Sequence, residues 1–276
     1  THLQQRRASI EHEISRYRSK LRSMIEPART SLIDQRAVQP RTLPASFPGP
    51  IGRWEFDGDV KDSQGDAHGK AQAGARIDDG QLVLADGGYV VTEPLKQSLT
   101  AKTLEAWVRL DNLDQRGGGV MSVQTLDGVL FDSIVFGEQE PRHWLAGSNV
   151  FARTKSFAAA REDEALDRLV HIAIVYHEDG RIAGYRDGKL YGKAYRSNGP
   201  QAFEAGKAIV AFGVRHLPAG GNRLLAGEIE SARVYDRALS ASQIAASHDA
   251  HGSSVSTADV LDTLLPDERL QVQALR

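Results

Sequence analysis

Short runs in which apolar and polar residues alternate recur between residues 51 and 236. They are LEAWVRL, GVMSV, LFDSIVFG, VHIAIVY, IAGYRDG, IVAFGVR and EIESARVY, and turns such as EDGR, RDGK and PAGGNR separate them. A repeat of two residues is the repeat of a β-strand, whose successive side chains point to opposite faces. Because no long helical pattern interrupts this region, the sequence argues against a parallel sheet with crossover helices. The pattern predicts an antiparallel, mainly β sandwich of two sheets.

Both ends of the chain carry helical patterns instead. Near the start, apolar residues alternate steps of four and three, which indicates either half of a coiled coil or an amphipathic helix that lies on the sandwich; they are Ile10, Ile14, Tyr17, Leu21, Met24, Ala28 and Leu32. Pro27 weakens the heptad, whereas Ser240 and Pro266 suit the first turns of C-terminal helices. We expect the terminal helices to pair as a stalk. The predicted domains are an N-terminal helix (1–36), a proline-rich linker (37–50), the sandwich (51–239) and C-terminal helices (240–276).

Bulk composition narrows the possible partners and chemistry. The net charge of -2 gives no basic surface for nucleic acid, and no apolar run approaches the ~20 residues of a membrane span. The chain has no cysteine, so disulfides, thiolate metal sites and a cysteine nucleophile are excluded. Its first residue is Thr, and we expect it to be a piece of a longer protein.

Several stretches resemble a known family. RWEFDGDVKDSQGDAHG, LEAWVRL, VHIAIVYHEDGRIAGYRDGKLYG and AGEIESARVYDRALSASQI are similar to the laminin-G-like, concanavalin A-like jelly rolls. LDQRGGGVMSV, FDSIVFGEQEPRHWLAGS and FGVRHLPAGGNRLLAGEIE resemble the jelly roll embedded, with coiled-coil segments, in large planctomycete proteins that carry a cytochrome c domain. The resemblance implies a jelly-roll sandwich, export to the periplasm or cell surface, and a role with complex polysaccharide. Without cysteine, this chain cannot attach haem itself.

The stretch FDGDVKDSQGDAHG is rich in oxygen ligands of the kind that calcium prefers. Related jelly rolls hold one calcium ion between this loop and an acid near the last strand. The resemblance thus implies a structural calcium site that consists of Asp57, Asp59, Asp62 and Glu230. Alternatively, Asp57, Asp59, Asp62 and Asp66 cap backbone groups in turns, and His68 fixes the loop.

No arrangement of residues points to catalysis. Related glycosidases carry a Glu-x-Asp-x-x-Glu strand, but here the corresponding residues are EIESAR, with Glu228 and Glu230 on one face. Asp132, Glu138 and Glu140 follow no catalytic pattern, and no nucleophile-elbow sequence is present. We expect this chain to bind and not to catalyse.

Two segments combine an aromatic residue with planar polar side chains, as sugar-binding sites do. The predicted ligand-binding residues are Arg142, His143, Trp144, Asn149, Arg215, His216 and Asn222. Trp144 is expected to be either an exposed platform or a packed anchor, whereas Trp54 and Trp107 belong to strand-like runs and are expected in the core. Two functions remain open: a carbohydrate-binding module, or a structural domain that docks onto other parts of its parent polypeptide.

Overall fold

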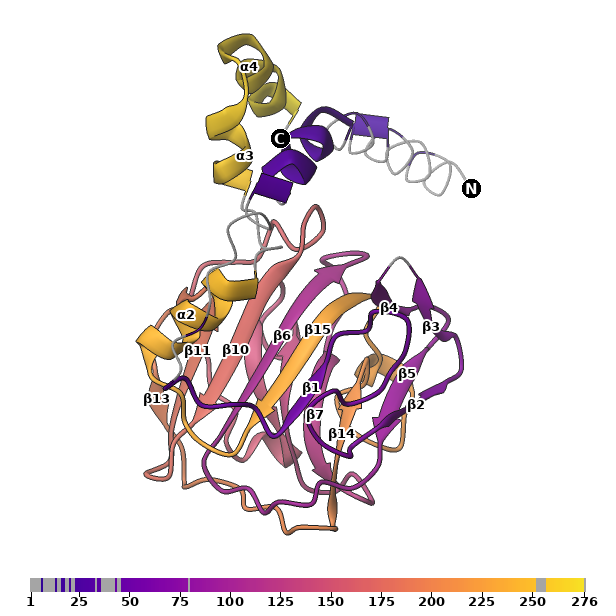
Figure 1. Ribbon diagram of the computed structural model, residues 1–276, viewed down its shortest axis with the longest axis vertical. Helices are drawn as coiled ribbons and strands as arrows, with labels where there is room; N and C mark the ends of the chain where they lie inside the picture. Colours follow the sequence, from indigo (N-terminus) through magenta and orange to yellow (C-terminus); the bar gives the residue numbers. More distant parts are fainter. Residues whose placement is uncertain are drawn as a thin grey trace. The chain divides into compact units, whose positions relative to one another are not determined.

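The computed structural model describes residues 46–78, 80–251 and 257–275, and near the start residues 6, 13, 16, 17, 20, 23–32, 34, 35 and 43. The chain forms two units (Figure 1). One comprises residues 42–251, and the other joins residues 1–41 to residues 252–276. Within the described residues no helix is long and apolar enough to cross a membrane.

The larger unit is built on two antiparallel sheets, as the alternating runs predict. Sheet A faces the viewer in Figure 1, and its main strands in spatial order are β12 (Lys189–Leu190), β11 (Arg181–Arg186), β10 (Val170–Tyr176), β6 (Lys102–Leu110), β15 (Gly227–Tyr235), β4 (Gln81–Leu84) and β3 (Ala75–Asp78). Two further strands join it at the side, β1 (Gly52–Trp54) beside β15 and β13 (Tyr195–Arg196) beside β11.

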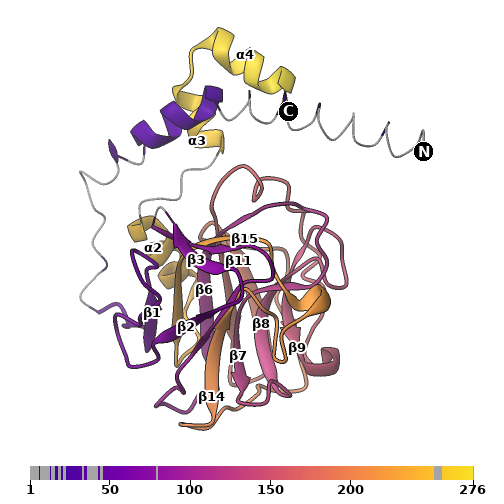
Figure 2. The same cartoon turned by 90° about the vertical axis from the view of Figure 1, so that its right-hand side faces the viewer.

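Sheet B forms the second layer, and several of its strands are labelled in Figure 2. In spatial order its strands are β2 (Gly69–Gln72), β5 (Tyr89–Thr92), β14 (Ala208–Phe212), β7 (Gly118–Thr125), β8 (Phe131–Phe136) and β9 (Trp144–Ser148). Short 3-10 turns follow β9 at Asn149–Phe151 and precede β15 at Gly221–Arg223. Two packed antiparallel sheets are the arrangement of a jelly-roll sandwich.

Strand alternation builds the core between the sheets. On β6 the inward residues are Leu104, Ala106, Val108 and Leu110, and the facing layer contributes Val123, Ile134, Phe136 and Phe212. Trp54 and Trp107 are fully buried, as predicted. Trp54 packs edge-on against Phe212, whereas Trp107 points to the outer face of sheet A.

Helix α2 (Ala241–His251) covers that outer face (Figure 1). Its Ile244 packs with Ala173, Val175 and Tyr235 in a second apolar cluster. Beside it, the buried carboxylate of Glu105 accepts hydrogen bonds from His171, from Tyr235 and from the helix residue Ser247, at 2.7, 3.2 and 2.9 Å. These contacts place α2 with the sandwich, although the sequence grouped residues 240–276 together.

The smaller unit pairs helices from the two ends of the chain, as the sequence predicts. Residues 23–32, 34 and 35 are helical, and α3 (Thr257–Thr263) and α4 (Pro266–Leu275) follow near the other end. Ile25, Val260 and Val272 are buried against one another. The predicted heptad positions Ile10, Ile14 and Leu21, and linker residues 37–42, 44 and 45, lie outside the described residues. The coiled-coil stalk remains a prediction, since the described helices are short.

Candidate functional site

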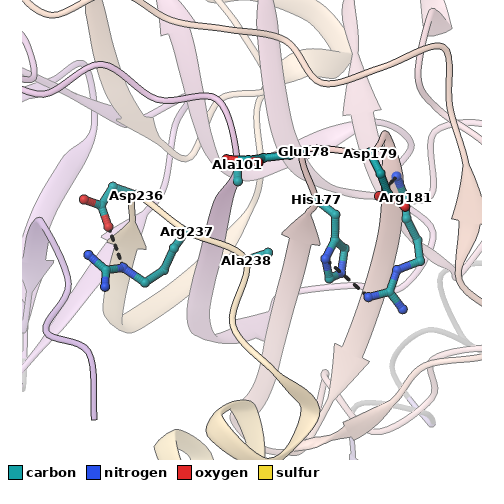
Figure 3. A pocket seen from close by; sticks show the side chains of 8 residues that line it. All are labelled: Ala101, His177, Glu178, Asp179, Arg181, Asp236, Arg237 and Ala238. Carbon is teal, nitrogen blue, oxygen red and sulfur yellow. Dashed lines mark hydrogen bonds and ion pairs between the residues drawn. The ribbon is translucent and has the colours of Figure 1, made fainter. Parts of the chain in front are cut away.

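An open hollow of about 420 Å³ lies at the end of sheet A where β6 begins (Figure 3). Strand register assembles it: Tyr176 at the end of β10 pairs with Lys102, and Tyr235 at the end of β15 pairs with Thr103. The segments that follow β10 and β15 therefore leave the sheet on either side of the first residues of β6. The lining residues are Ala101, His177, Glu178, Asp179, Arg181, Asp236, Arg237 and Ala238.

The wall contributed by the β10–β11 turn has a defined conformation. The Gly180 amide donates to the His177 carbonyl at 3.0 Å, and the Asp179 carboxylate accepts from the Arg181 amide at 3.0 Å. Gly180 has a φ of 81°, in the left-handed region where glycine is unstrained. The sequence EDGR thus forms a tight turn that presents Glu178 and Asp179 to solvent.

The opposite wall is attached to the first residues of β6. The Thr103 hydroxyl donates to the Arg237 carbonyl at 2.9 Å and accepts from the Leu239 amide at 3.0 Å. Leu239 is buried in the cluster beneath α2. These contacts position Asp236 and Arg237, whose side chains bond to each other at 2.7 Å.

Charges around the hollow alternate in sign. Figure 3 shows the Asp236–Arg237 pair and the His177–Arg181 pair on either side of Ala101. Outside the hollow, Arg196 binds Asp179 at 2.8 Å. Among the described residues, the Glu178 carboxylate has no bonding partner, so its acceptor capacity faces solvent. Partial burial and the nearby Arg181 guanidinium lower the pKa of His177, which keeps its imidazole neutral near pH 7.

This arrangement suits hydroxyl groups. Carboxylates accept hydrogen bonds from hydroxyls, and guanidinium groups donate to them, so a polyhydroxylated ligand can satisfy both. The eight lining residues include no Phe, Tyr or Trp, and His177 carries the one ring among them. The lining thus offers a ligand mainly polar contacts.

The sequence did not reveal the hollow, although a signal was present. HEDGR and DRA follow the two strands that flank β6, and the antiparallel pairing of both strands with β6 places their ends together. Finding the hollow requires knowing that β10 and β15 are the neighbours of β6. Their alternating patterns predict strands but not which strands pair.

Two of the predicted ligand-binding residues, Arg215 and Asn222, contact each other, but they do not line the hollow. Arg215 forms an ion pair with Glu138 and a 3.4 Å hydrogen bond with Asn222, which joins the two predicted segments. Arg142 pairs with Asp114 at 3.0 Å, and the His143 ring contacts the Pro141 carbonyl at 2.8 Å. Burial raises the pKa of Glu138 against the opposing effect of Arg215. The side chains of Arg215, Glu138 and Asn222, here called the Arg215–Glu138 cluster, thus bond to one another.

Two other predicted residues lie around Phe131. The His216 ring stacks on Phe131 at 4.4 Å, and the Asn149 side chain accepts from Arg153 at 3.0 Å. Phe131 also accepts from Arg153 through its carbonyl, at 3.0 Å. Asn149 and His216 are thus placed near one another, and neither lines the hollow.

Trp144 is not a platform. It lies in β9, is 1% exposed, and donates its indole N–H to Glu162 at 2.8 Å. Its ring packs against Phe136. Of the two alternatives for Trp144, the packed anchor therefore holds, although WLAGS forms a strand and not a loop, and its first side chain points into the sandwich.

The predicted calcium ligands do not assemble around one point. Asp62 is buried, and its carboxylate accepts from the amides of Arg53, Gln64, Gly65 and Ala67 at 2.9 to 3.2 Å. Among the remaining proposed ligands, Asp59 accepts from the Lys61 amide, and Glu230 contacts His251 of α2 at 3.1 Å. In the described part of the chain, no three histidine or acidic side chains form a group that could hold a metal ion. Turn capping accounts for the contacts of Asp59 and Asp62, and a calcium ion held by Asp57, Asp59, Asp62 and Glu230 stays a prediction.

The acids of β15 also have partners. Glu228 is bound by Arg109 through the guanidinium Nε at 2.9 Å, and Glu230 is bound by His251. A β-bulge between Ile229 and Ser231 interrupts the register beside them. Both carboxylates therefore serve contacts within the sandwich unit.

Solved structures with a similar fold include carbohydrate-binding and receptor-binding domains. Domain 4 of AbnA, a GH43 extracellular arabinanase from Geobacillus stearothermophilus, in complex with arabinotriose, matches with a TM-score of 0.56 and 20% identity over 71% of this chain and 96% of that domain. The botulinum neurotoxin type G receptor-binding domain matches with a TM-score of 0.53 and 15% identity, over 74% of this chain and 52% of that one. At these identities the likeness shows the fold alone.

A family model gives the stronger assignment. It is described as the concanavalin A-like lectin/glucanases superfamily, and it matches residues 84–245. No curated protein sequence matches the chain. The matched residues run from the end of β4 into α2 and include most of the sandwich. Because this match covers more than half of the chain, the chain belongs to the concanavalin A-like lectin/glucanases superfamily.

Proposed function

We propose that this chain is a non-catalytic carbohydrate-binding module whose binding site is the hollow at the start of β6. The observation that carries the proposal is the hollow itself, where the Glu178 carboxylate, which has no bonding partner in the part of the chain that the structure describes, stands beside alternating guanidinium and carboxylate groups. Such groups bind vicinal hydroxyls by accepting from one and donating to another.

Two relatives in fold support a carbohydrate ligand. The arabinanase domain was solved with arabinotriose, and botulinum neurotoxin type C depends on interaction with two ganglioside molecules to enter cells. Neither identifies the sugar that this chain binds. They do indicate that sandwiches of this architecture carry sugar-binding surfaces.

The partners of the carboxylate side chains support binding without catalysis. Glycoside hydrolysis needs two carboxyl groups held on either side of the scissile bond, with one of them free to exchange a proton. Glu228 and Glu230 are engaged by Arg109 and His251. In the hollow, Asp179 and Asp236 are paired with arginine, and this leaves Glu178 without an acid partner.

The proposed setting is a larger exported protein that acts in the periplasm or at the cell surface. The family resemblance, and a neighbour that belongs to an extracellular enzyme, support this location. Any haem of a planctomycete-type parent would then be carried by another domain.

The experiment is a glycan-array screen with wild type and with Glu178→Ala, which removes a free acceptor from an exposed position. The matched control is Asp114→Ala, an exposed acid at the Arg142 pair outside the hollow. We expect binding by wild type and by the control, and a loss of tenfold or more in the Glu178 variant. Wild-type binding that Glu178→Ala leaves unchanged would exclude the hollow, and turnover of a glycan would exclude the non-catalytic role.

A second candidate function is a structural domain that docks onto other parts of its parent polypeptide. The smaller unit favours it, because Tyr17, Leu265 and Leu270 are 48%, 67% and 64% exposed. Tyr17 and Leu270 are helical, and Leu265 lies between α3 and α4; exposed apolar residues in and beside short helices suit a coiled-coil stalk with a further helix. Analytical ultracentrifugation of wild type and of Leu265→Lys/Leu270→Lys tests for self-association through these residues, and association unaffected by the substitutions would exclude them.

A further inference from the structure

We propose that a chain of uncharged sugars, and not a single terminal sugar, lies along this end of the sandwich from the hollow to Phe151. The inference rests on the proposed function and adds the class of ligand, an extended neutral polysaccharide. Three observations carry it: an exposed aromatic ring, a rigid loop that presents it, and a continuous line of polar side chains between that ring and the hollow.

The aromatic ring belongs to Phe151, in the short turn after β9. It is 48% exposed, and its neighbour Val150 is 88% exposed. The turn between β7 and β8 adds the exposed side chains of Leu126 and Val129. Because Asp132, close to that turn, pairs with Ser148 in the sheet register, the two turns lie at the same end of sheet B. Each turn therefore exposes apolar side chains at this end, of the kind that the C–H faces of sugars contact.

The backbone holds the turn after β9 in an unfavourable conformation. Val150 and Phe151 have φ values of 44° and 57°, in the left-handed region that bulky residues avoid. Neighbouring bonds keep the loop there: Ser148 bonds to Thr154 at 2.9 Å, and the Arg153 amide donates to the Ser148 hydroxyl at 2.9 Å. A strained loop that exposes its apolar side chains is maintained at the expense of local stability, which points to a use for the exposed ring.

The base of the loop is connected to the base of the hollow through the core. The Arg153 guanidinium binds one oxygen of Asp132 at 2.9 Å, and the Lys102 ammonium binds the other at 2.9 Å. Lys102 follows Ala101, which lines the hollow. This buried trio fixes the spacing between the Phe151 loop and the hollow.

A second connection runs over the surface. The Lys155 ammonium donates to the Arg196 carbonyl at 2.8 Å, and the Arg196 guanidinium binds Asp179 of the hollow at 2.8 Å. The Tyr195 hydroxyl, which donates to the Arg153 carbonyl at 3.0 Å, holds this strip against the loop. The exposed side chains of Lys155, Arg196 and Asp179 thus span the distance from the aromatic turn to the hollow.

The chemistry along the strip suits a neutral polymer. Phe151 offers an apolar face, Lys155 and Arg196 offer spare N–H donors, and Glu178 offers free acceptors. Cations and carboxylates alternate, so the strip has no field that would attract a polymer of one charge. A free carboxylate at the hollow disfavours acidic sugars, which would place like charges together.

The test measures affinity against ligand length by isothermal titration calorimetry, with arabino-, xylo- and cello-oligosaccharides from the disaccharide to the octasaccharide. Wild type is compared with Phe151→Ala and with Leu190→Ala, an equally exposed apolar residue on β12. We expect at least one series to bind more tightly with length, by about tenfold or more. Phe151→Ala should remove that gain and leave the shortest bound oligosaccharide unaffected, and Leu190→Ala should behave as wild type.

The alternative outcomes separate the two claims. If short oligosaccharides bind, with loss on Glu178→Ala, but affinity is independent of length, the hollow stands and the extended strip is rejected. A length gain that Phe151→Ala leaves intact also rejects the strip. If wild type binds none of these series and no glycan on the array, the proposed function fails, and the strip fails with it. Equal melting temperatures of the variants show that each remains folded.

Discussion

Glu105 illustrates how this fold accommodates a buried charge. Its side chain is fully buried, and burial alone would raise its pKa, yet the hydrogen bond from His171 and the charge of Arg233 lower that pKa to about 2. The Gly188 amide donates to the other ring nitrogen of His171 at 3.2 Å, which orients the imidazole toward Glu105. One carboxylate thereby connects β6, β10, β15 and α2.

We expect Glu105→Gln to lower the free energy of unfolding by roughly 3–5 kcal/mol, because it leaves buried partners without their charge. The folded pKa of about 2 lies below the ordinary value of 4.5, so the carboxylate stabilises the fold fully above pH 4.5. This contribution is lost as the pH falls toward 2. Urea unfolding at several pH values measures both effects; a difference between wild type and variant that does not shrink on acidification would contradict the assignment.

Trp144 shows what the sequence could not reveal about single side chains. The local sequence around Trp144 is compatible with an exposed binding platform or with a core residue. Its burial depends on Glu162, which lies 18 residues further along the chain and accepts the indole N–H. We expect Trp144→Phe to destabilise the fold by about 1–2 kcal/mol, through loss of a buried hydrogen bond and some volume. Glycan affinity should not change, and a specific loss of affinity in a fully folded variant would restore Trp144 to the site.

Among the structural elements, predictability follows strand length. All seven alternating runs found in the sequence contain strands of the structure: β6, β7, β8, β10, β11, β14 and β15. The strands β2, β3, β4, β5, β9, β12 and β13 were not predicted. Apart from β9, which has five residues, they contain two to four residues and show too little alternation. Pairing partners were also not predictable, because register depends on contacts between distant segments.

Helix α2 is an integral part of the sandwich unit in this structure, and its removal should have a measurable cost. Loss of α2 would expose Tyr235 and the outer apolar residues of β10, and would deprive Glu105 of Ser247. We expect a fragment of residues 46–239 to melt about 10 °C or more below a fragment of residues 46–251. Equal melting temperatures would show that α2 is only an appended helix.

For the whole molecule, the sandwich unit has its own large core and should fold without the terminal helices. Two of the predicted calcium ligands already have partners within the chain, since Asp62 accepts from four backbone amides and Glu230 contacts His251 of α2. We expect the melting temperature of the full chain to be the same in chelator and in millimolar calcium. A rise with calcium concentration would mean that the ion assembles ligands which this structure keeps apart.

The sequence predicted the mainly β architecture, the paired terminal helices and the buried Trp54 and Trp107. It did not predict the hollow, because that site arises where the ends of β10 and β15 meet β6. The predicted ligand residues instead lie apart: Arg215 and Asn222 beside Glu138, Asn149 and His216 around Phe131, Arg142 and His143 in the turn before β9, and Trp144 in the core. A site that several strand ends form can be predicted only when the strand order is known. Loop composition alone pointed to residues that mostly bond within the protein.

Hydrogen–deuterium exchange of the full chain, with and without the best ligand from the glycan array, tests most directly whether the hollow binds sugar. We expect the ligand to protect the backbone amides of residues 177–181 and 236–238, which border the hollow. Residues 137–143 and 215–223, around the Arg215–Glu138 pair, should exchange at the same rate in both samples. Protection of those residues, with no change around the hollow, would reject the hollow and place the sugar at the Arg215–Glu138 cluster.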